Sequence, residues 1–122
     1  MEQNKYFENT HTNAGTIKAG TKNVKMSWAI KDGMDSEIEH IKPGCGCTDA
    51  LIDGNVVNAK YHDSSDVSVI NSNNSKSILV TKSLTAYLKD GKPLKVKNDR
   101  GLEIFNPDKK SIRLTFTVTV TS

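Results

Sequence analysis

Regular alternation of apolar and polar residues is the strongest pattern in this sequence. Every second residue is apolar along residues 24–30, and along residues 112–121 apolar side chains alternate with threonines and one arginine. Period-2 alternation is typical of a strand that buries one face, and β-branched threonine favours the same conformation. The pattern therefore predicts a half-buried strand in each segment.

Shorter segments between these two have the same character, and no stretch keeps an apolar helical face over three turns. The further predicted strands are residues 37–41, 50–52, 56–61, 67–70, 78–88 and 94–97. Turn residues separate them at positions 32–33, 53–54, 71–74, 89–93, 98–101 and 106–108. About seven to nine short strands at this spacing predict an all-β fold, an antiparallel β-sandwich.

The chain of 122 residues has the length of one domain. We expect residues 10–122 to form the sandwich and residues 1–9 to be an N-terminal arm or a first strand. Because the alternation sets which side chains share a face, it also predicts the core. The expected core residues are Val24, Met26, Trp28, Ile30, Ile38, Ile112, Leu114, Phe116 and Val118. Trp28 is expected to stack across the sandwich near the turn that holds Cys45 and Cys47.

Charge and hydropathy narrow the classes of partner. The net charge of +3 comes from lysines that are spread along the chain and interleaved with acids, and the arginines are Arg100 and Arg113. Nucleic-acid-binding proteins cluster arginine on one face, so we expect no nucleic-acid partner. No apolar run approaches the ~20 residues of a membrane-spanning helix, and the N-terminal residues lack the apolar core of a secretion signal. We therefore expect a protein made in the cytoplasm that does not bind a membrane.

Residues 38–48 contain the densest local chemistry, with Cys45 and Cys47 separated by one glycine. A disulfide between them would close a very small ring and constrain few unfolded conformations, so it would stabilise the fold weakly and be easily reduced. Alternatively, both thiols are small packing residues in a tight turn, where Gly44 and Gly46 supply positive φ angles. We favour the packing interpretation.

A metal site is the third interpretation of the same segment. Cys45, Cys47 and His40 are soft ligands that suit Zn²⁺ or Cu⁺. A closed zinc site needs four ligands, and the remaining histidines, His11 and His62, are distant in the sequence. We therefore expect neither a metal site nor a cofactor.

The Gly-Cys-Gly-Cys-Thr run, preceded by a short predicted strand, resembles a bacterial and phage family of unknown function marked by a Cys-Gly-Cys-Thr motif. The residues around Gly15 and Gly20 are similar to the opening of that family, and residues 105–107 are similar to its closing Asn-Pro turn. Members resemble the immunoglobulin-like domains of the PapD, major-sperm-protein and ASH group. The resemblance implies an immunoglobulin-like sandwich and brings no catalytic residues.

No catalytic arrangement is visible in the sequence. A cysteine nucleophile would need an activating base, and His40 lies in phase with Ile38 on its predicted strand, as a partly buried packing residue would. The sequence has no metalloprotease motif and no phosphate-binding glycine loop. We therefore expect a protein that is not an enzyme.

Three classes of function are open at this point. We favour a structural interaction module, specifically an auxiliary (decoration) protein of a phage virion. Its expected partner is the major capsid protein or another virion protein, and a second copy of the chain is the alternative partner. Immunoglobulin-like modules commonly decorate phage heads, so the virion assignment is an analogy at the level of fold. The alternatives are a small metal- or redox-handling protein that uses the Cys-Gly-Cys turn, and a PapD-like adaptor that binds peptides at a sheet edge.

The interface is expected at the N-terminal arm and at the lysine-rich turns. Tyr6 and Phe7 precede the first glycine turn, have no obvious place in the core, and would act as exposed anchors. The last strand carries Arg113 as its one charge, so it is expected to be a poorly protected sheet edge. The lysines of the turns that bound this strand are Lys92, Lys95, Lys109 and Lys110.

Overall fold

Strands make up the regular structure of the protein in the computed structural model, which describes residues 5–64, 70 and 77–122. The strands of this part of the chain are β1 (His11–Lys18), β2 (Val24–Ala29), β3 (Ile38–Pro43), β4 (Thr48–Asp53), β5 (Val56–Tyr61), β6 (Ser77–Leu88), β7 (Lys95–Lys97), β8 (Glu103–Phe105) and β9 (Ser111–Thr121), with a 3₁₀ turn, η1 (Asp35–Glu37), before β3. The predicted all-β fold is confirmed.

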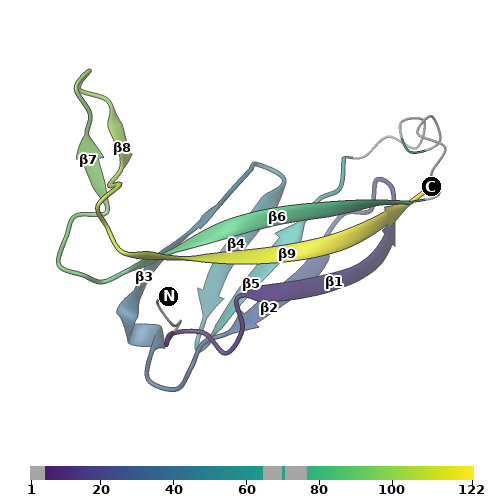
Figure 1. The fold of residues 1–122 in the computed structure, drawn as a ribbon, viewed down its shortest axis with the longest axis horizontal. Helices are drawn as coiled ribbons and strands as arrows, with labels where there is room; N and C mark the ends of the chain where they lie inside the picture. Colours follow the sequence, from purple (N-terminus) through teal and green to yellow (C-terminus); the bar gives the residue numbers. More distant parts are fainter. Residues whose placement is uncertain (1–4, 65–69, 71–76) are drawn as a thin grey trace.

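The strands form two layers and a projecting hairpin (Figure 1). One sheet has the order β1-β9-β6-β3, the facing sheet has the order β2-β5-β4, and β7 pairs with β8. With β7 and β8 set aside, these orders match the C-F-G and B-E-D strands of an immunoglobulin-type sandwich. The antiparallel arrangement holds except where β1 pairs in parallel with β9, so the larger sheet is mixed.

The core lies between the two sheets and contains the residues that the alternation selects. Of the predicted core residues, all but Ile112 are buried. Ile112 is partly exposed because it is the second residue of β9, where the chain returns from the hairpin. Further core side chains come from β3, β5 and β6, namely Ile41, Val57, Ala59, Tyr61, Leu84, Ala86 and Leu88.

Trp28 extends from β2 across the core to the facing sheet. Its ring lies 6.2 Å from that of Phe116 in the facing sheet, and its Nε1 donates a hydrogen bond to the carbonyl oxygen of Thr115 at 3.0 Å. Trp28 is level with Val57, whereas Thr48, which follows the cysteines, pairs with Tyr61 at the other end of β5. In the larger sheet, however, Thr115 pairs with Ser83, whose carbonyl accepts a hydrogen bond from the N–H of Gly44 next to Cys45. The expected proximity of Trp28 to the cysteine turn therefore stays a prediction.

The last strand is not a sheet edge. β9 is hydrogen-bonded on both sides, to β1 and to β6, so the prediction of an exposed edge there is wrong. The larger sheet instead ends at β1 and β3, and the smaller sheet ends at β2 and β4. Of the predicted strand at residues 67–70, Ile70 is buried. The rest of that strand and the predicted turn at 71–74 lie outside the described residues.

The N-terminal segment is packed against the sandwich. Phe7 is buried and forms an antiparallel bridge with Ile30, and the backbone N–H of Lys31 donates to the carbonyl of Tyr6 at 2.8 Å. Tyr6 packs partly buried against the core. The expectation that these aromatic residues are exposed on an arm is therefore wrong, because Ile30 extends the apolar face of β2 far enough to cover Phe7.

Candidate interaction hairpin

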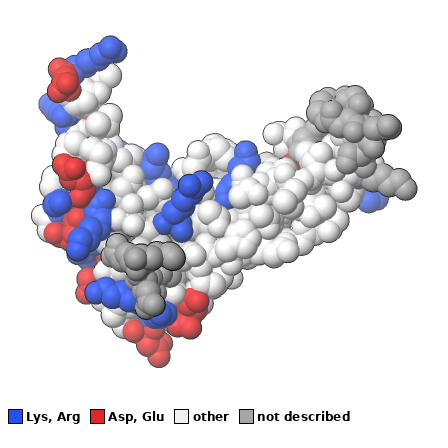
Figure 2. Space-filling view, in the orientation of Figure 1, with Lys and Arg blue, Asp and Glu red and all other residues white. Residues whose placement is uncertain are grey.

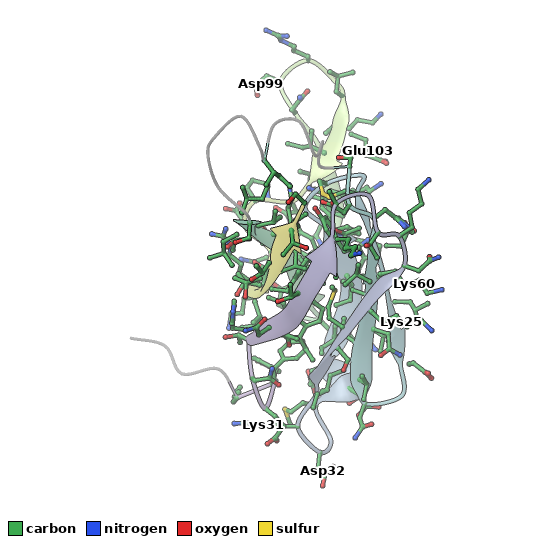
Figure 3. All side chains as sticks on the ribbon, turned by 90° about the vertical axis from the view of Figure 1, so that its right-hand side faces the viewer. Lys25, Lys31, Asp32, Lys60, Asp99 and Glu103 are labelled. Atoms are coloured by element: carbon green, nitrogen blue, oxygen red, sulfur yellow. A yellow bond between two sulfur atoms is a disulfide. The ribbon has the colours of Figure 1, made fainter. Side chains whose placement is uncertain are left out.

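The β7–β8 hairpin extends from the end of the sandwich where β6 ends and β9 begins (Figure 1). Its turn is held by Asn98, whose Oδ1 accepts hydrogen bonds from the N–H groups of Arg100 at 2.9 Å and Leu102 at 3.0 Å. Gly101 adopts a φ of 76°, a conformation that L side chains rarely take. The turn predicted at residues 98–101 is thus a structured tip, and Asp99 marks its far end in Figure 3.

The hairpin exposes apolar side chains. Leu102 is 59% exposed and Ile104 is 39% exposed. Two strands of three residues have no second layer to cover these side chains, and an isolated hairpin of this size is marginally stable in water. The hairpin therefore needs an anchor on the sandwich, and its apolar surface is available to a partner.

Phe105 anchors the hairpin to the outer face of the larger sheet. Its ring stacks on Tyr87 of β6, with centroids 5.2 Å apart and planes 9° apart, and on His40 of β3 at 5.8 Å. The ammonium groups of Lys42 and Lys95 lie 5.1 Å and 5.0 Å from the ring centroid. Ring stacking with cation–π contacts fixes the end of β8 against the sheet.

The position of His40 differs from the prediction. A bulge between Ile38 and His40 shifts the register on β6, so Ile41 takes the next core position and His40 is exposed. An inserted residue reverses the faces of the side chains that follow it. His40 is therefore a stacking partner of Phe105 rather than a partly buried packing residue.

Lys109 joins the two chain segments at the base of the hairpin. Its buried ammonium group contacts a carboxylate oxygen of Glu39 at 2.9 Å and of Asp90 at 3.0 Å, and donates to the carbonyl of Lys92 at 2.8 Å. Burial alone would lower the pKa of Lys109, but the hydrogen bonds and charges of Glu39 and Asp90 outweigh it and raise that pKa. The charge of Lys109, one of the predicted interface residues, is neutralised within the fold, and its contact with a partner stays a prediction.

Asp90 accepts hydrogen bonds from both segments. Its Oδ2 accepts from the N–H of Lys110 at 2.8 Å, and its Oδ1 accepts from the N–H of Lys92 at 3.0 Å and from Lys109. The N–H of Lys110, assisted by the other donors, holds the pKa of Asp90 well below its usual range against the opposing effect of burial. The carboxylate thus holds the strand that leaves the sandwich beside the strand that returns.

Replacing Asp90 with asparagine is expected to lower the melting temperature at neutral pH and to remove an acid-dependent part of the stability. Because the folded-state pKa of Asp90 is depressed, the unfolded chain takes up its proton first, and stability is lost as the pH falls below about 4. The difference in melting temperature between the two proteins should be constant between about pH 5 and 7 and shrink below about pH 4.

The control for this titration is Asp99→Asn at the hairpin tip, which should leave the acid dependence unchanged. A difference between Asp90→Asn and the unsubstituted protein that stays the same down to pH 2 would show that the carboxylate charge of Asp90 does not hold the base.

Three of the predicted interface lysines remain exposed, and all three lie at this end of the molecule. The side chains are those of Lys92, Lys95 and Lys110. Lys92 donates from Nζ to the carbonyl of Asp108 at 3.1 Å, and Lys95 forms an ion pair with Glu103 at 3.7 Å. Figure 2 shows charged side chains of both signs gathered at the hairpin end, beside a face over β6 and β9 that carries fewer charges, most of them Lys or Arg. Whether these lysines contact a partner stays a prediction.

The cysteines form a disulfide in the turn between β3 and β4. Cys45 and Cys47 are bonded to each other and are both half-buried, so the favoured interpretation of two buried free thiols is wrong. Neither Gly44 nor Gly46 has a positive φ. Gly44 is instead required for close approach, since a Cβ there would lie 2.6 Å from the carbonyl oxygen of Ser83.

The three weak metal-ligand candidates are not brought together. His40 is stacked on Phe105, while Cys45 and Cys47 are bonded to each other. The other histidines also have local partners, because His62 lies 3.5 Å from Asp49 and His11 lies 2.7 Å from the hydroxyl of Thr115. Within residues 5–64, 70 and 77–122, no group of three or more His, Cys, Asp or Glu side chains is placed to hold a metal ion.

Comparison with known proteins adds no relative: no family model, curated protein or solved structure matches this chain. In the part of the chain that the structure describes, no helix is long and apolar enough to cross a membrane.

Proposed function

We propose that this protein is a structural interaction module that binds a partner protein through the β7–β8 hairpin. The observation that carries the proposal is the exposure of Leu102 and Ile104 on a hairpin whose base is fixed to the sandwich. Apolar side chains on a projecting element favour association, because burying them against a partner removes apolar area from water.

The fixed base favours binding for a second reason. The contacts of Phe105 and Lys109 order the hairpin before any partner arrives. A preformed element loses less conformational freedom on association than a loop that must be ordered. Loops at the end of an immunoglobulin-type sandwich are also the usual position of its binding surface.

The charged residues around the apolar ones suit a protein partner. Lys95, Lys97, Asp99, Arg100 and Glu103 give the hairpin both signs of charge. An apolar centre with a polar rim is the usual composition of a protein–protein interface. We propose that the assembly is a phage virion and that the partner is the major capsid protein or another virion protein. The virion assignment is based on analogy with other proteins of immunoglobulin-type fold.

Site-specific photo-crosslinking tests the proposal. A photoreactive amino acid at position 102, introduced in cells that produce the protein and its particles, is expected to give an adduct with one protein that sediments with the particles. Position 51 is the matched control, because Leu51 on β4 is 60% exposed and Leu102 is 59% exposed. Equal adducts from both positions, or none from 102, would contradict binding through the hairpin.

The same experiment separates the partner classes. An adduct from position 102 with a second copy of this chain would show a homo-oligomer, and binding through the hairpin would stand while the capsid partner would not. An adduct that never sediments with particles would overturn the virion assignment alone.

A further inference from the structure

The disulfide of the β3–β4 turn has few of the properties of a structural crosslink. Cys45 and Cys47 are separated by two positions in the sequence, so the closed loop contains one residue between them. The stabilisation a disulfide gives through the unfolded chain grows with loop length, and this loop is close to the minimum. The bond lies wholly within the turn between β3 and β4 and links no residues that are distant in the sequence.

The disulfide is reachable from solvent. Both cysteines are half-buried, Gly46 is exposed, and a side chain at Gly46 would meet no atom within 4 Å. Exposed disulfides that contribute little to folding are the ones that exchange with other thiols.

A small positively charged cavity adjoins Cys45. It has a volume of about 170 Å³ and is lined by Gly44, Cys45, Thr81, Lys82, Ser83 and Arg113. Lys82 and Arg113 supply two positive charges, and no carboxylate is among the lining residues. Positive charge favours a thiolate over a thiol, so an incoming thiolate is attracted to this side of the disulfide.

The other cysteine lies closer to a buried hydroxyl. The Oγ1 of Thr48 is 3.6 Å from the Sγ of Cys47 and 3.9 Å from that of Cys45, and Thr48 is buried. A hydroxyl at this position can donate a weak hydrogen bond to sulfur, and the bond strengthens when the sulfur becomes an anion. Cys47 is therefore the better placed of the two cysteines to leave as a thiolate.

Backbone hydrogen bonds hold the turn in place when the disulfide opens. The N–H of Gly44 donates to the carbonyl of Ser83 at 3.0 Å, and the N–H of His62 donates to the carbonyl of Cys47 at 2.8 Å. These bonds tie the two ends of the turn to β6 and to the end of β5, so opening the disulfide need not unfold the turn.

We propose that the Cys45–Cys47 disulfide is a thiol–disulfide exchange site for a dithiol that carries negative charge. A substrate thiolate enters the cavity beside Lys82 and Arg113 and bonds to the Sγ of Cys45. The Cys45–Cys47 bond breaks, and Cys47 leaves with the electron pair as a thiolate that accepts the hydrogen bond of Thr48. The second thiolate of the substrate then attacks the substrate sulfur that is bonded to Cys45. The substrate disulfide forms, and Cys45 leaves as a thiolate.

The exchange transfers two electrons from the substrate to the protein. The substrate dithiol loses two electrons and becomes a disulfide, and the Cys45–Cys47 disulfide gains them. The two protons that the substrate thiols release pass through solvent to the two cysteines. This activity is independent of binding through the hairpin, so the failure of one proposal leaves the other standing.

The charge preference is tested with monothiols as probes on the folded, oxidised protein. Glutathione is anionic, mercaptoethanol is neutral and cysteamine is cationic. With rates corrected for the thiolate fraction of each reagent, glutathione is expected to react fastest and cysteamine slowest. Arg113→Gln should lower the glutathione rate about three- to tenfold, the mercaptoethanol rate less and the cysteamine rate least, because the net negative charge of the reacting thiolate falls in that order. Arg100→Gln, at the hairpin tip, is the matched control and should leave all three rates unchanged.

Two further measurements test the attacked sulfur and the accessibility of the disulfide in the folded protein. The mixed disulfide with glutathione, trapped by acid and mapped by mass spectrometry, should lie on Cys45; an adduct on Cys47 would overturn the assignment of the attacked sulfur. Dithiothreitol should reduce the disulfide at a denaturant concentration where circular dichroism shows the fold intact. Reduction that occurs only on unfolding, or an Arg113→Gln protein that matches Arg100→Gln, would overturn the exchange site.

Discussion

Replacing Trp28 with alanine is expected to lower the free energy of unfolding by about 3–5 kcal/mol, the range for truncating a large aromatic side chain in a core. Trp28 has an exposed fraction of 0% and packs against Phe116 from the facing sheet, so its removal leaves a cavity between the two layers. The substitution also removes the donor to the Thr115 carbonyl. Since small domains have total stabilities of about 5–15 kcal/mol, this loss should be visible as a large fall in the urea midpoint.

Trp28→Phe is the control for this experiment, because it keeps an aromatic ring in the core and removes the hydrogen bond. It should cost clearly less than Trp28→Ala. A Trp28→Ala protein with an unchanged urea midpoint would show that the two sheets do not pack through this side chain.

Replacing Phe7 with alanine is the second substitution with a large expected effect, also about 3–5 kcal/mol. Phe7 is 1% exposed, and backbone hydrogen bonds on both sides of it hold the segment against the end of β2. The N–H of Glu8 donates to the carbonyl of Ala29 at 2.9 Å, and the N–H of Lys31 donates to that of Tyr6. Phe7 therefore belongs to the core, and Tyr6 packs against it.

Urea unfolding followed by circular dichroism measures this effect. Leu79→Ala is the control, since Leu79 is 70% exposed on β6 and should lose little stability when shortened. Equal small effects of both substitutions would mean that the N-terminal segment is detached from the sandwich in solution.

The sequence predicts the central strands well because their alternation is uninterrupted. β2 and β9 keep strict period-2 patterns over their whole lengths, and the core assignments made from them are correct apart from Ile112. The cost of burying a polar side chain makes this signal strong wherever one face of a strand packs and the other is wet.

Strands with a bulge are predicted poorly by alternation. β1 is not predicted from the alternation because its pairing with β9 shifts between Asn13 and Thr16, at Gly15, which has a positive φ. The bulge in β3 has the same effect on His40. One extra residue reverses the side-chain faces, and nothing in the local composition marks where the extra residue is placed.

The base of the hairpin could not be predicted for a different reason. Lysine is almost always exposed, and Lys109 is buried because Glu39 and Asp90 approach it from other strands and turns. Such a contact depends on the tertiary fold and leaves no periodic pattern. The exposure of Leu102 and Ile104 is not predicted because Leu102 precedes β8 and β8 itself has three residues, too few to show an alternation.

The central claim is that the hairpin, and not another exposed apolar site, binds the partner. The most direct test is the dissociation constant for the crosslinked partner measured with two matched variants, Leu102→Asp and Leu51→Asp, after circular dichroism has shown that both are folded. A buried aspartate in place of leucine loses apolar contact and carries an unpaired charge, so Leu102→Asp should weaken binding by at least about tenfold. Leu51→Asp should leave the dissociation constant within about twofold of the unsubstituted protein. The opposite order, or equal weakening by both variants, would contradict binding through the hairpin.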